Sequence, residues 1–509
     1  MKNSPNSIAK TALIITIVTA VSRILGFARE AVIAYVFGVG AVTDAYAVAV
    51  RVVGTAGLLV STYLLQIFIP IYTRALEEGG EETSLKASNN VLNFSLIINF
   101  LIAGVLYVVA PIIIGITGFD NEQASLALAA TNILILQLPL MTFVHFFVGY
   151  LTARKSFFGP NFIGIPVNIV IMTLCLVFGA QGGVRGLSFA ALTATIIQAL
   201  ILIIWLRKEG YRHKFYLRIN TLEIRNGMKL LIPALLSSAL LDLKTWVDTI
   251  IATYLGEGNT AAIGFALRLI TLVQGLFIVP IANMIFSYMS EYAAKNDIKG
   301  MLNILWKTVR VILFFVIPIV VIAMPSGFDV TRIVYQRGEF TAEATIMTGT
   351  ALVWYLPGLL GMTIYIFLVH FFHGLQNTKI PMICSAITVV INIGLSIWLS
   401  DVMGIGGLTL ATSISITLTA VLLLIFLRKK IGPLGLKETA MDVVKMAICA
   451  VPCFLAVLGA RYFMAEYSAI IRFAATTLAG GAAYVIVALM IKEIVVRDAV
   501  HMIRERFNK

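Results

Sequence analysis

Charged residues are scarce in this chain. Of its 509 residues, 12% are Asp, Glu, Lys or Arg and 60% are hydrophobic, whereas a soluble globular domain carries about 25% charged residues. Four windows contain no charge at all and approach the roughly 20 residues that a helix needs to cross a bilayer: 97–116, 187–205, 311–328 and 381–399. These windows exclude a soluble fold and predict an all-α polytopic membrane protein.

Cysteine is also rare, and the four cysteines are not spaced for chemistry. Cys175, Cys384, Cys449 and Cys453 all lie in apolar stretches, and no histidine or second cysteine pair accompanies the last two. We interpret them as small core residues, because this spacing fits neither a zinc site nor a redox motif. The chain also lacks a Walker A sequence and a nucleophile-elbow motif. We therefore expect a transporter that hydrolyses no ATP, and not an enzyme.

The apolar segments predict 14 transmembrane spans. Their approximate limits are 10–36, 42–73, 88–117, 124–153, 158–180, 185–206, 226–256, 260–290, 301–324, 343–374, 379–400, 404–427, 440–463 and 470–491. Lys and Arg gather in alternate loops, and the loops 38–43, 118–123 and 256–260 have none. The positive-inside rule then predicts a multi-pass protein of the cytoplasmic membrane with both termini in the cytoplasm. The exceptions to this pattern are Arg185, Arg332, Arg337, Arg461 and Arg472.

The net charge of +13 follows mostly from this loop asymmetry. The chain has no soluble basic domain, so we expect contact with anionic membrane lipids and no binding of nucleic acid.

An internal repeat divides the chain. Residues 33–40 resemble residues 251–258 at an offset of 218, and Pro160 and Gly186 match Pro381 and Gly407 at an offset of 221. The predicted domains are an N-terminal lobe (1–206), a basic interlobe linker (207–225), a C-terminal lobe (226–430), and two further spans with a cytoplasmic tail (431–509). Each lobe has six spans, so the pseudo-two-fold axis runs along the membrane normal. We expect the linker to lie on the cytoplasmic surface as an amphipathic segment.

Ionisable residues inside the spans are the candidate site, because such groups are costly in a bilayer and usually face a cavity or a partner. The first span carries Arg23, Arg29 and Glu30, and the second carries Asp44 and Arg51. Span seven contains Asp242, Lys244 and Asp248, and span eight contains Arg268. One interpretation is that Arg29 pairs with Asp44, and Lys244 with Asp248. The excess of arginine favours an anionic substrate, since a guanidinium binds a diphosphate or carboxylate through two hydrogen bonds.

Three motifs in the chain are distinctive. The first runs through residues 22–30 and continues in Phe37-Gly38 and 43–46, and the others are residues 335–341 and 376–381. Together they resemble the motifs of the MurJ (MviN) lipid II flippase family, within the superfamily of multidrug, oligosaccharidyl-lipid and polysaccharide exporters.

The resemblance implies a V-shaped fold of two lobes with alternating access, a cationic central cavity for lipid II, and a groove for the polyprenyl tail at the last two spans. It implies substrate binding by residues that match cavity positions of the family: Ser22, Arg23, Arg29, Asp44, Arg51 and Arg268. The partners it implies are lipid II, membrane lipids and cell-wall synthesis proteins.

One stretch departs from the family pattern. Family members usually continue after the second span's basic residue with Pro-Asn and then Arg, whereas this chain reads Val52-Val53-Gly54-Thr55-Ala56-Gly57-Leu58-Leu59. The alternative functions are therefore a flippase or exporter of another polyprenyl-diphosphate-linked oligosaccharide or amphiphile, and a membrane scaffold for cell-wall synthesis enzymes that transports nothing.

The resemblance also implies a sodium ion between spans seven, eleven and twelve. Oxygen atoms of Asp248, Asn392 and Thr412 are its candidate ligands in this sequence. The alternative is that these residues only pack against polar neighbours. No other cofactor is expected, and an ion gradient or the membrane potential would drive transport.

Overall fold

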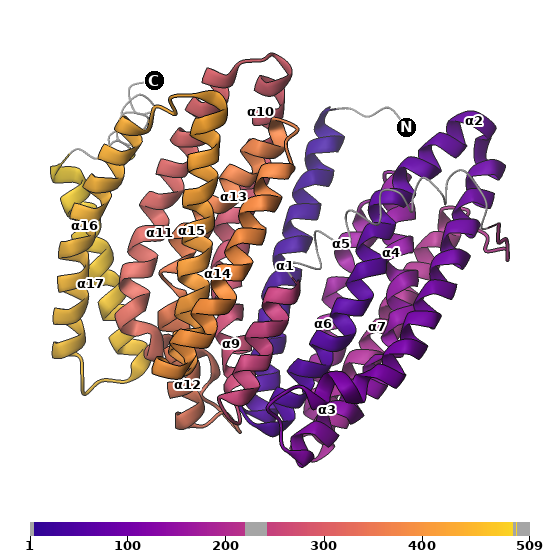
Figure 1. Cartoon of the computed structure of the whole chain (residues 1–509), viewed down its shortest axis with the longest axis horizontal. Helices are drawn as coiled ribbons and strands as arrows, with labels where there is room; N and C mark the ends of the chain where they lie inside the picture. Colours follow the sequence, from indigo (N-terminus) through magenta and orange to yellow (C-terminus); the bar gives the residue numbers. More distant parts are fainter. Residues whose placement is uncertain (1–4, 219–241, 492–494, 496–509) are drawn as a thin grey trace. The chain divides into compact units, whose positions relative to one another are not determined.

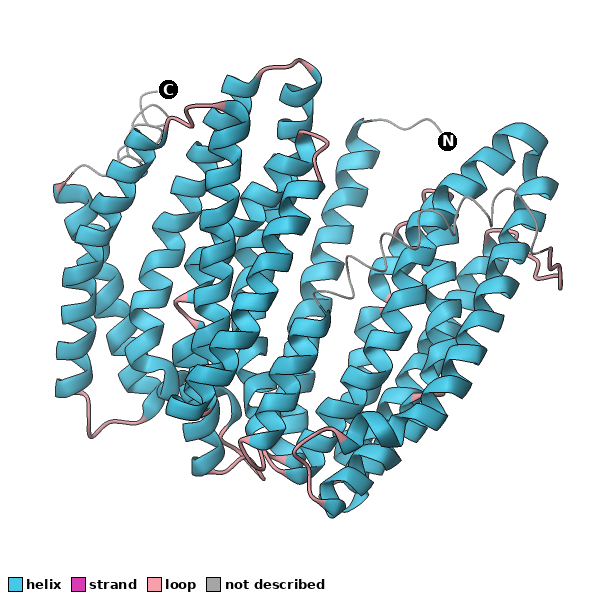
Figure 2. Cartoon of the chain, viewed as in Figure 1, coloured by secondary structure: helices cyan, strands magenta, loops and turns pink. Residues whose placement is uncertain are grey.

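The computed structural model describes residues 5–218, 242–491 and 495, with the side chains of residues 5–13 and 58–67 excepted. Every regular element in these ranges is a helix (Figure 2). The all-α fold class is thereby confirmed.

Long apolar helices account for most of the described chain. Within the described residues, nine helical segments could cross a membrane, and two further helix pairs, bent by 43° and 47°, raise the number to 11. The remaining predicted spans, 10–36, 42–73 and 226–256, include residues that the structure does not describe in full. The number of 14 is compatible with these findings and stays a prediction.

The surfaces of these helices are apolar where a soluble protein would be polar. Phe100, Leu101 and Val108 have exposed fractions of 62%, 65% and 70%, and Trp398 is 64% exposed. Contiguous exposed apolar surface on this scale indicates contact with lipid. The chain is therefore a multi-pass membrane protein.

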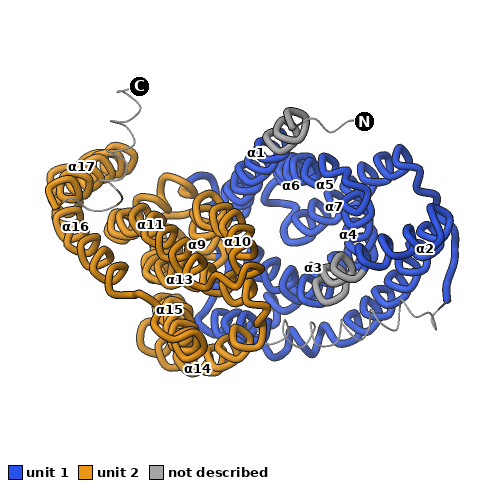
Figure 3. Tube along the Cα trace, turned by 90° about the horizontal axis from the view of Figure 1, so that it is seen from above, with its two compact units in different colours: residues 1–261, 337–340 blue, residues 262–336, 341–509 orange. Residues whose placement is uncertain are grey.

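The chain forms two compact units (Figure 3). Unit 1 comprises Met1–Ala261 with Arg337–Phe340, and unit 2 comprises Ala262–Gln336 with Thr341–Lys509. A helix over residues 242–254 belongs to unit 1. Its Trp246 indole donates to the Thr55 hydroxyl (3.2 Å), and its Thr253 hydroxyl accepts from the Gly118 backbone N–H (2.9 Å). Part of the predicted linker, 207–225, lies outside the described residues, so the predicted domain limits stay predictions.

The elements of each unit follow one another in chain order. Unit 1 contains α1 (Pro5–Phe37), α2 (Ala41–Gly115), α3 (Asn121–Leu134), α4 (Gln137–Ala153), α5 (Phe158–Phe162), α6 (Gly164–Phe178), η1 (Ala180–Gly182) and α7 (Gly183–Lys208). The helix α9 (Asn259–Val273) begins in unit 1 and continues into unit 2. Unit 2 then contains η2 (Gln274–Ile278), α10 (Val279–Ala294), α11 (Ile298–Tyr335), α12 (Ala342–Tyr355), α13 (Gly358–Gly374), α14 (Lys379–Met403), α15 (Ile405–Ile431), α16 (Leu436–Phe463) and α17 (Ala469–Met490).

The helix α2 is two helices joined at a glycine pair. Gly79 and Gly80 have non-helical backbone angles, and Gly80 has φ 69°. This left-handed conformation is one that glycine adopts without a steric penalty. The break separates the two spans that the sequence predicts at 42–73 and 88–117.

Local backbone features recur between the two halves and support the internal repeat. The bent pair α3–α4 corresponds to the bent pair α12–α13. Lys155 and Gln376, 221 positions apart, both have positive φ just after a helix end. Gly183, the first residue of α7, and Gly404, directly before α15, also have positive φ at this offset. Positive φ is unusual for Lys and Gln, so its recurrence at one offset indicates duplicated local structure.

Residues 211–218, which we call the basic strap, follow α7. The helix ends in a Schellman motif, in which Gly210 donates to the carbonyl of Arg207 and Tyr211 donates to that of Leu206. The strap has no regular secondary structure. Three buried asparagines of α2 bind its backbone. Asn90 accepts from Arg218 N (2.7 Å) and donates to Arg218 O (3.1 Å), Asn93 donates to Lys214 O and Tyr216 O, and Asn89 donates to Arg212 O.

An aromatic core lies beside the strap within unit 1. Phe68 of α2 packs on Phe146 of α4 with ring centroids 4.8 Å apart, and Tyr150 packs on Tyr211 at 5.0 Å. Tyr211 donates its phenolic proton to Asn89 (2.7 Å), and burial raises the pKa of Tyr211, so this donor stays protonated.

In unit 2, α11 and α16 are neighbouring helices (Figure 1), and ion pairs join them toward both ends. Arg310 of α11 pairs with Asp442 of α16 at 2.8 Å. Toward the other end of the helices, buried Asp329 of α11 pairs with Arg461 of α16 at 2.8 Å. Both carboxylate oxygens of Asp329 also accept from Arg472 of α17. Nineteen residues separate the two ion-paired positions in each of the two helices, a rise of about 28 Å, close to the thickness of a hydrocarbon core.

These contacts explain two of the exceptions in the loop-charge pattern. Arg461 and Arg472 have a buried carboxylate as partner, so their position follows from packing and not from the side of the membrane on which they lie.

Candidate functional site

The predicted site residues of α1 lie on different sides of that helix. Ser22 faces α6, where its hydroxyl occupies the space that a Cβ on Gly164 would need, and its carbonyl accepts from Asn168 (3.3 Å). Ser22 is thus part of the contact between α1 and α6. The residue after it, Arg23, is exposed.

The guanidinium of Arg29 is partly buried and has an acidic partner. Its Nη2 donates to Glu30 Oε1 at 2.5 Å, and the two side chains are 25% and 13% exposed. The interpretation that Arg29 pairs with Asp44 is not what the structure shows, because the carboxylate of Asp44 binds elsewhere. Arg51 of α2 is partly buried.

Asp44 is fully buried near the start of α2 and caps the N-terminus of another helix. One of its carboxylate oxygens accepts from Gly258 N (2.5 Å) and the other from Ala261 N (2.7 Å). These two N–H groups belong to the start of α9, where the first backbone donors of a helix have no partner within it. A carboxylate at this position is also favoured by the helix dipole.

The start of α2 receives a carboxylate in return. Glu257, which immediately precedes Gly258, accepts from Ala41 N through Oε1 at 2.9 Å. The Thr43 hydroxyl accepts from Gly40 N at 3.1 Å. The first turns of α2 and α9 are therefore held by reciprocal caps, in which each helix is capped by an acid from the other segment.

Residues 337–340, which belong to the second motif of the sequence analysis, contact the end of α1, a few residues before the start of α2. Glu339 N donates to Tyr35 O at 2.9 Å, near the end of α1. A Cβ on Gly338 would collide with the Tyr35 backbone, and one on Gly38 would collide with Glu339 O; both glycines have positive φ. Residues 37–38 and 337–340 belong to two separate sequence motifs, and in unit 1 these motifs contact each other directly.

The remaining predicted residues are divided between the units. Asp248 of unit 1 pairs with Lys244 at 3.0 Å, as the i,i+4 interpretation predicts. In unit 2, Arg268 is exposed on α9, and a π-helical turn, Gln274–Ile278, follows it. Such turns are frequent at functional sites.

The candidate sodium ligands of unit 2 are polar groups on neighbouring helices. Asn392 of α14 is fully buried and donates to Ser415 (3.0 Å), while its Oδ1 has no hydrogen-bond partner among the described residues. Thr412 of α15 is partly buried. This free oxygen fits a cation, whereas the pairing of Asp248 with Lys244 opposes one. In the part of the chain that the structure describes, no group of three His, Cys, Asp or Glu residues is placed to hold a metal ion.

The sequence interpretation did not identify the partners of Asp44. Gly258 and Ala261 act through their backbone, which leaves no side-chain signal. Glu257 lies three residues before the predicted span 260–290, but it caps α2 and not the helix that follows it, so its position in the sequence gives no signal for this contact.

Comparison with known proteins gives a consistent family. The sequence model of the family described as "Lipid II flippase MurJ" matches residues 33–478. The probable lipid II flippase MurJ of Treponema pallidum is 25% identical over 439 residues, which cover 84% of this chain and 83% of that protein. A solved structure titled lipid II flippase MurJ, inward closed conformation, has a TM-score of 0.80 at 23% identity and covers 95% of this chain and 100% of its own.

A second solved structure shares the fold. An inward-facing multidrug resistance MATE family transporter of the MOP superfamily has a TM-score of 0.66 at 15% identity, covering 82% of this chain and 96% of its own.

Replacement of Asp44 by Asn tests the cap on α9. The amide would oppose a donor to one of the two backbone N–H groups, so we expect the free energy of unfolding to fall by about 1–2 kcal/mol. Hydrogen exchange at Gly258 and Ala261 should become faster. The matched control is Asp120→Asn, which alters the N-cap of α3 and should leave exchange at these two amides unchanged. Unaltered exchange in Asp44→Asn would contradict the cap.

Proposed function

This chain belongs to the lipid II flippase MurJ family, and from that premise we propose that it carries lipid II from the inner to the outer leaflet of the cytoplasmic membrane by alternating access. The observation that carries the proposal is the family match through residues 33–478. As a member of a transporter family, the chain is not an enzyme.

The proposed role of the arginines is to bind the diphosphate of the substrate. A guanidinium offers two parallel donors to phosphate oxygens, and such charge-assisted bonds are about twice as strong as neutral ones. Arg23 and Arg268 are exposed, so they can reach a ligand without leaving a buried position. Arg29 and Arg51 are the weaker candidates, because both are partly buried and Arg29 already binds Glu30.

Asp44 has a different role in this proposal from the one implied by the resemblance. Both oxygens of Asp44 accept from backbone N–H groups at the start of α9. This carboxylate would therefore only repel a diphosphate. We propose that the reciprocal caps lock the first turns of α2 and α9 together in one state of the cycle. Release of the substrate on that side then requires both caps to open.

A specific observation favours the second candidate, a flippase for another polyprenyl-diphosphate-linked oligosaccharide. The stretch Val52–Leu59, which lacks the family's usual arginine, carries no charged residue; Val52 and Val53 are 2% exposed, and a Cβ on Gly57 would meet the Leu138 side chain. No cation can be supplied from these positions. The headgroup would then meet fewer positive charges than in typical family members.

Transport by arginine variants tests the substrate role. We expect Arg23→Ala and Arg268→Ala to lower lipid II transport by about 10- to 100-fold, the equivalent of one charged hydrogen bond of about 1.5–3 kcal/mol. Lys at either position should restore only part of the rate. The measurement is growth of a bacterium depleted of its own lipid II flippase, with membrane level and melting temperature as controls. Arg185→Ala, an exposed arginine outside the proposed site, is the matched control. Full activity of Arg23→Ala would remove this role, and failure of the well-inserted wild-type chain to support growth would favour the second candidate.

We propose the orientation in which both termini lie in the cytoplasm. The four native cysteines are fully buried, so single exposed cysteines report the topology without further changes. Asp401→Cys and Glu466→Cys should react in intact cells with an impermeant thiol reagent, and Glu82→Cys and Lys430→Cys should react only after lysis. All four positions are exposed. The reverse labelling would invert the proposed direction of transport.

We propose sodium as the coupling ion, on the basis of the buried Oδ1 of Asn392. Binding to the native state alone raises stability with ligand concentration. The melting temperature of the purified protein should therefore rise more in NaCl than in choline chloride at equal ionic strength, and Asn392→Ala should lose this difference. Ser400→Ala on the same helix, whose hydroxyl bonds within its own turn, should retain it. A wild-type protein that responds equally to both salts would exclude sodium binding under these conditions.

Partners beyond lipids are a further part of the proposal. Cell-wall synthesis proteins fit a flippase functionally, because they consume the exported precursor.

A further inference from the structure

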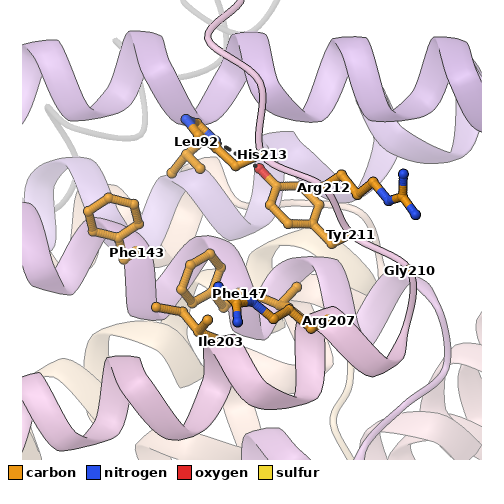
Figure 4. Close-up of a pocket in the computed structure, with 10 residues that line it drawn as sticks. Leu92, Phe143, Phe147, Ile203, Arg207, Gly210, Tyr211, Arg212 and His213 are labelled. Carbon is orange, nitrogen blue, oxygen red and sulfur yellow. Dashed lines mark hydrogen bonds between the residues drawn. The ribbon is translucent and has the colours of Figure 1, made fainter.

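A cavity of about 650 Å³ lies in unit 1 under the basic strap (Figure 4). Its walls come from α2, α4, α7 and the strap. This volume is within the roughly 300–1,000 Å³ that is usual for small-molecule pockets. None of the residues proposed above to bind lipid II or sodium lines it.

The interior of the cavity is apolar and its mouth is basic. The interior side chains are Leu92, Phe143, Phe147, Ile203 and Leu206. Figure 4 shows Phe143, Phe147 and Ile203 on one side of the space and Tyr211 and His213 of the strap across from them. The mouth carries Arg207, Arg212 and His213, all exposed.

Among the basic groups of the mouth, His213 bonds to the Tyr211 hydroxyl (3.5 Å), and the two arginines are the groups available to a ligand. The strap is fixed through its backbone by Asn89, Asn90 and Asn93, which leaves its charged side chains available. Among the described residues, no acidic side chain pairs with Arg207 or Arg212. The nearby acid in sequence, Glu209, lies 4.0 Å from Arg154 instead.

The lining of the cavity changes from basic to apolar with increasing depth in the membrane. Arg207 lies in the last turn of α7, where the span ends. Phe143 lies eleven residues before Arg154, the C-cap of α4, which corresponds to a rise of about 16 Å. The cavity therefore runs from a cationic mouth at the membrane surface to aromatic and aliphatic side chains well inside the helix bundle. A molecule with an anionic head and a hydrocarbon chain has the matching order of groups.

We propose that this cavity binds an anionic phospholipid from the leaflet on the strap side, with an acyl chain between Phe143, Phe147 and Ile203 and the phosphate between Arg207 and Arg212. Such a lipid holds the strap against α2 and α4, and so fixes the start of the segment that leads from unit 1 toward the second half of the chain. The occupant is a resident lipid and not the transported one. Its binding does not depend on the proposed transport function.

The test is lipid binding to the purified full-length protein in a neutral detergent. Native mass spectrometry and thermal unfolding would be measured with dioleoyl phosphatidylglycerol and with dioleoyl phosphatidylcholine. We expect the anionic lipid to bind at least tenfold more tightly and to raise the melting temperature. The double variant Arg207→Gln/Arg212→Gln should lose this preference, and Ile203→Trp, which fills the interior, should lose binding of the anionic lipid while its charges stay in place.

The matched control is Lys208→Gln/Lys429→Gln, which removes the same charge from exposed positions outside the cavity lining and should retain the preference. Equal binding of both lipids, an equal loss in this control, or unaltered binding in Ile203→Trp would overturn the proposal. Displacement of the bound phosphatidylglycerol by a polyprenyl phosphate at lower concentration than by a second anionic phospholipid would also overturn it, because the cavity would then be part of the substrate path.

Discussion

Two carboxylates at helix starts hold the end of unit 1 where α2 and α9 begin. Each helix N-terminus presents several N–H groups that its own backbone cannot satisfy, and in an apolar surrounding each unsatisfied group costs several kcal/mol. Asp44 and Glu257 meet this need reciprocally, one for α9 and the other for α2. The contact of residues 337–340 with Tyr35 completes the same region. Both caps act on backbone N–H groups, so a state in which they open must supply other partners for these groups.

Three cations inside the described helices each have a specific acidic partner. Arg29 has Glu30, Lys244 has Asp248, and Arg310 has Asp442. Removal of one partner from a buried pair is far more costly than removal of both. Exposed Arg23 and Arg268 differ from these residues in their access to a ligand. Exposure, and not the number of arginines, therefore separates the candidate ligands from the structural cations.

Much of the fold could be predicted from the sequence because the bilayer demands it. Apolar runs of the required length identify helices wherever they occur, and the pair Lys244–Asp248 follows from helical spacing alone. The role of Asp44 could not be predicted, since its partners are backbone groups more than 200 residues away. The conformation of the strap could not be predicted either. Its backbone is held by Asn89, Asn90 and Asn93 of α2, and residues 207–225 by themselves do not indicate these partners.

The ion pairs of Asp329 have a consequence for the order in which the protein is made. The ribosome completes α11 more than 120 residues before Arg461 and Arg472 exist. Until α16 and α17 are inserted, the nascent chain holds a carboxylate that has no guanidinium to receive it and that is costly to keep within lipid. Biogenesis of unit 2 is therefore complete only when the last two helices arrive, and a chain truncated before them displays an uncompensated acid that membrane quality control can recognise.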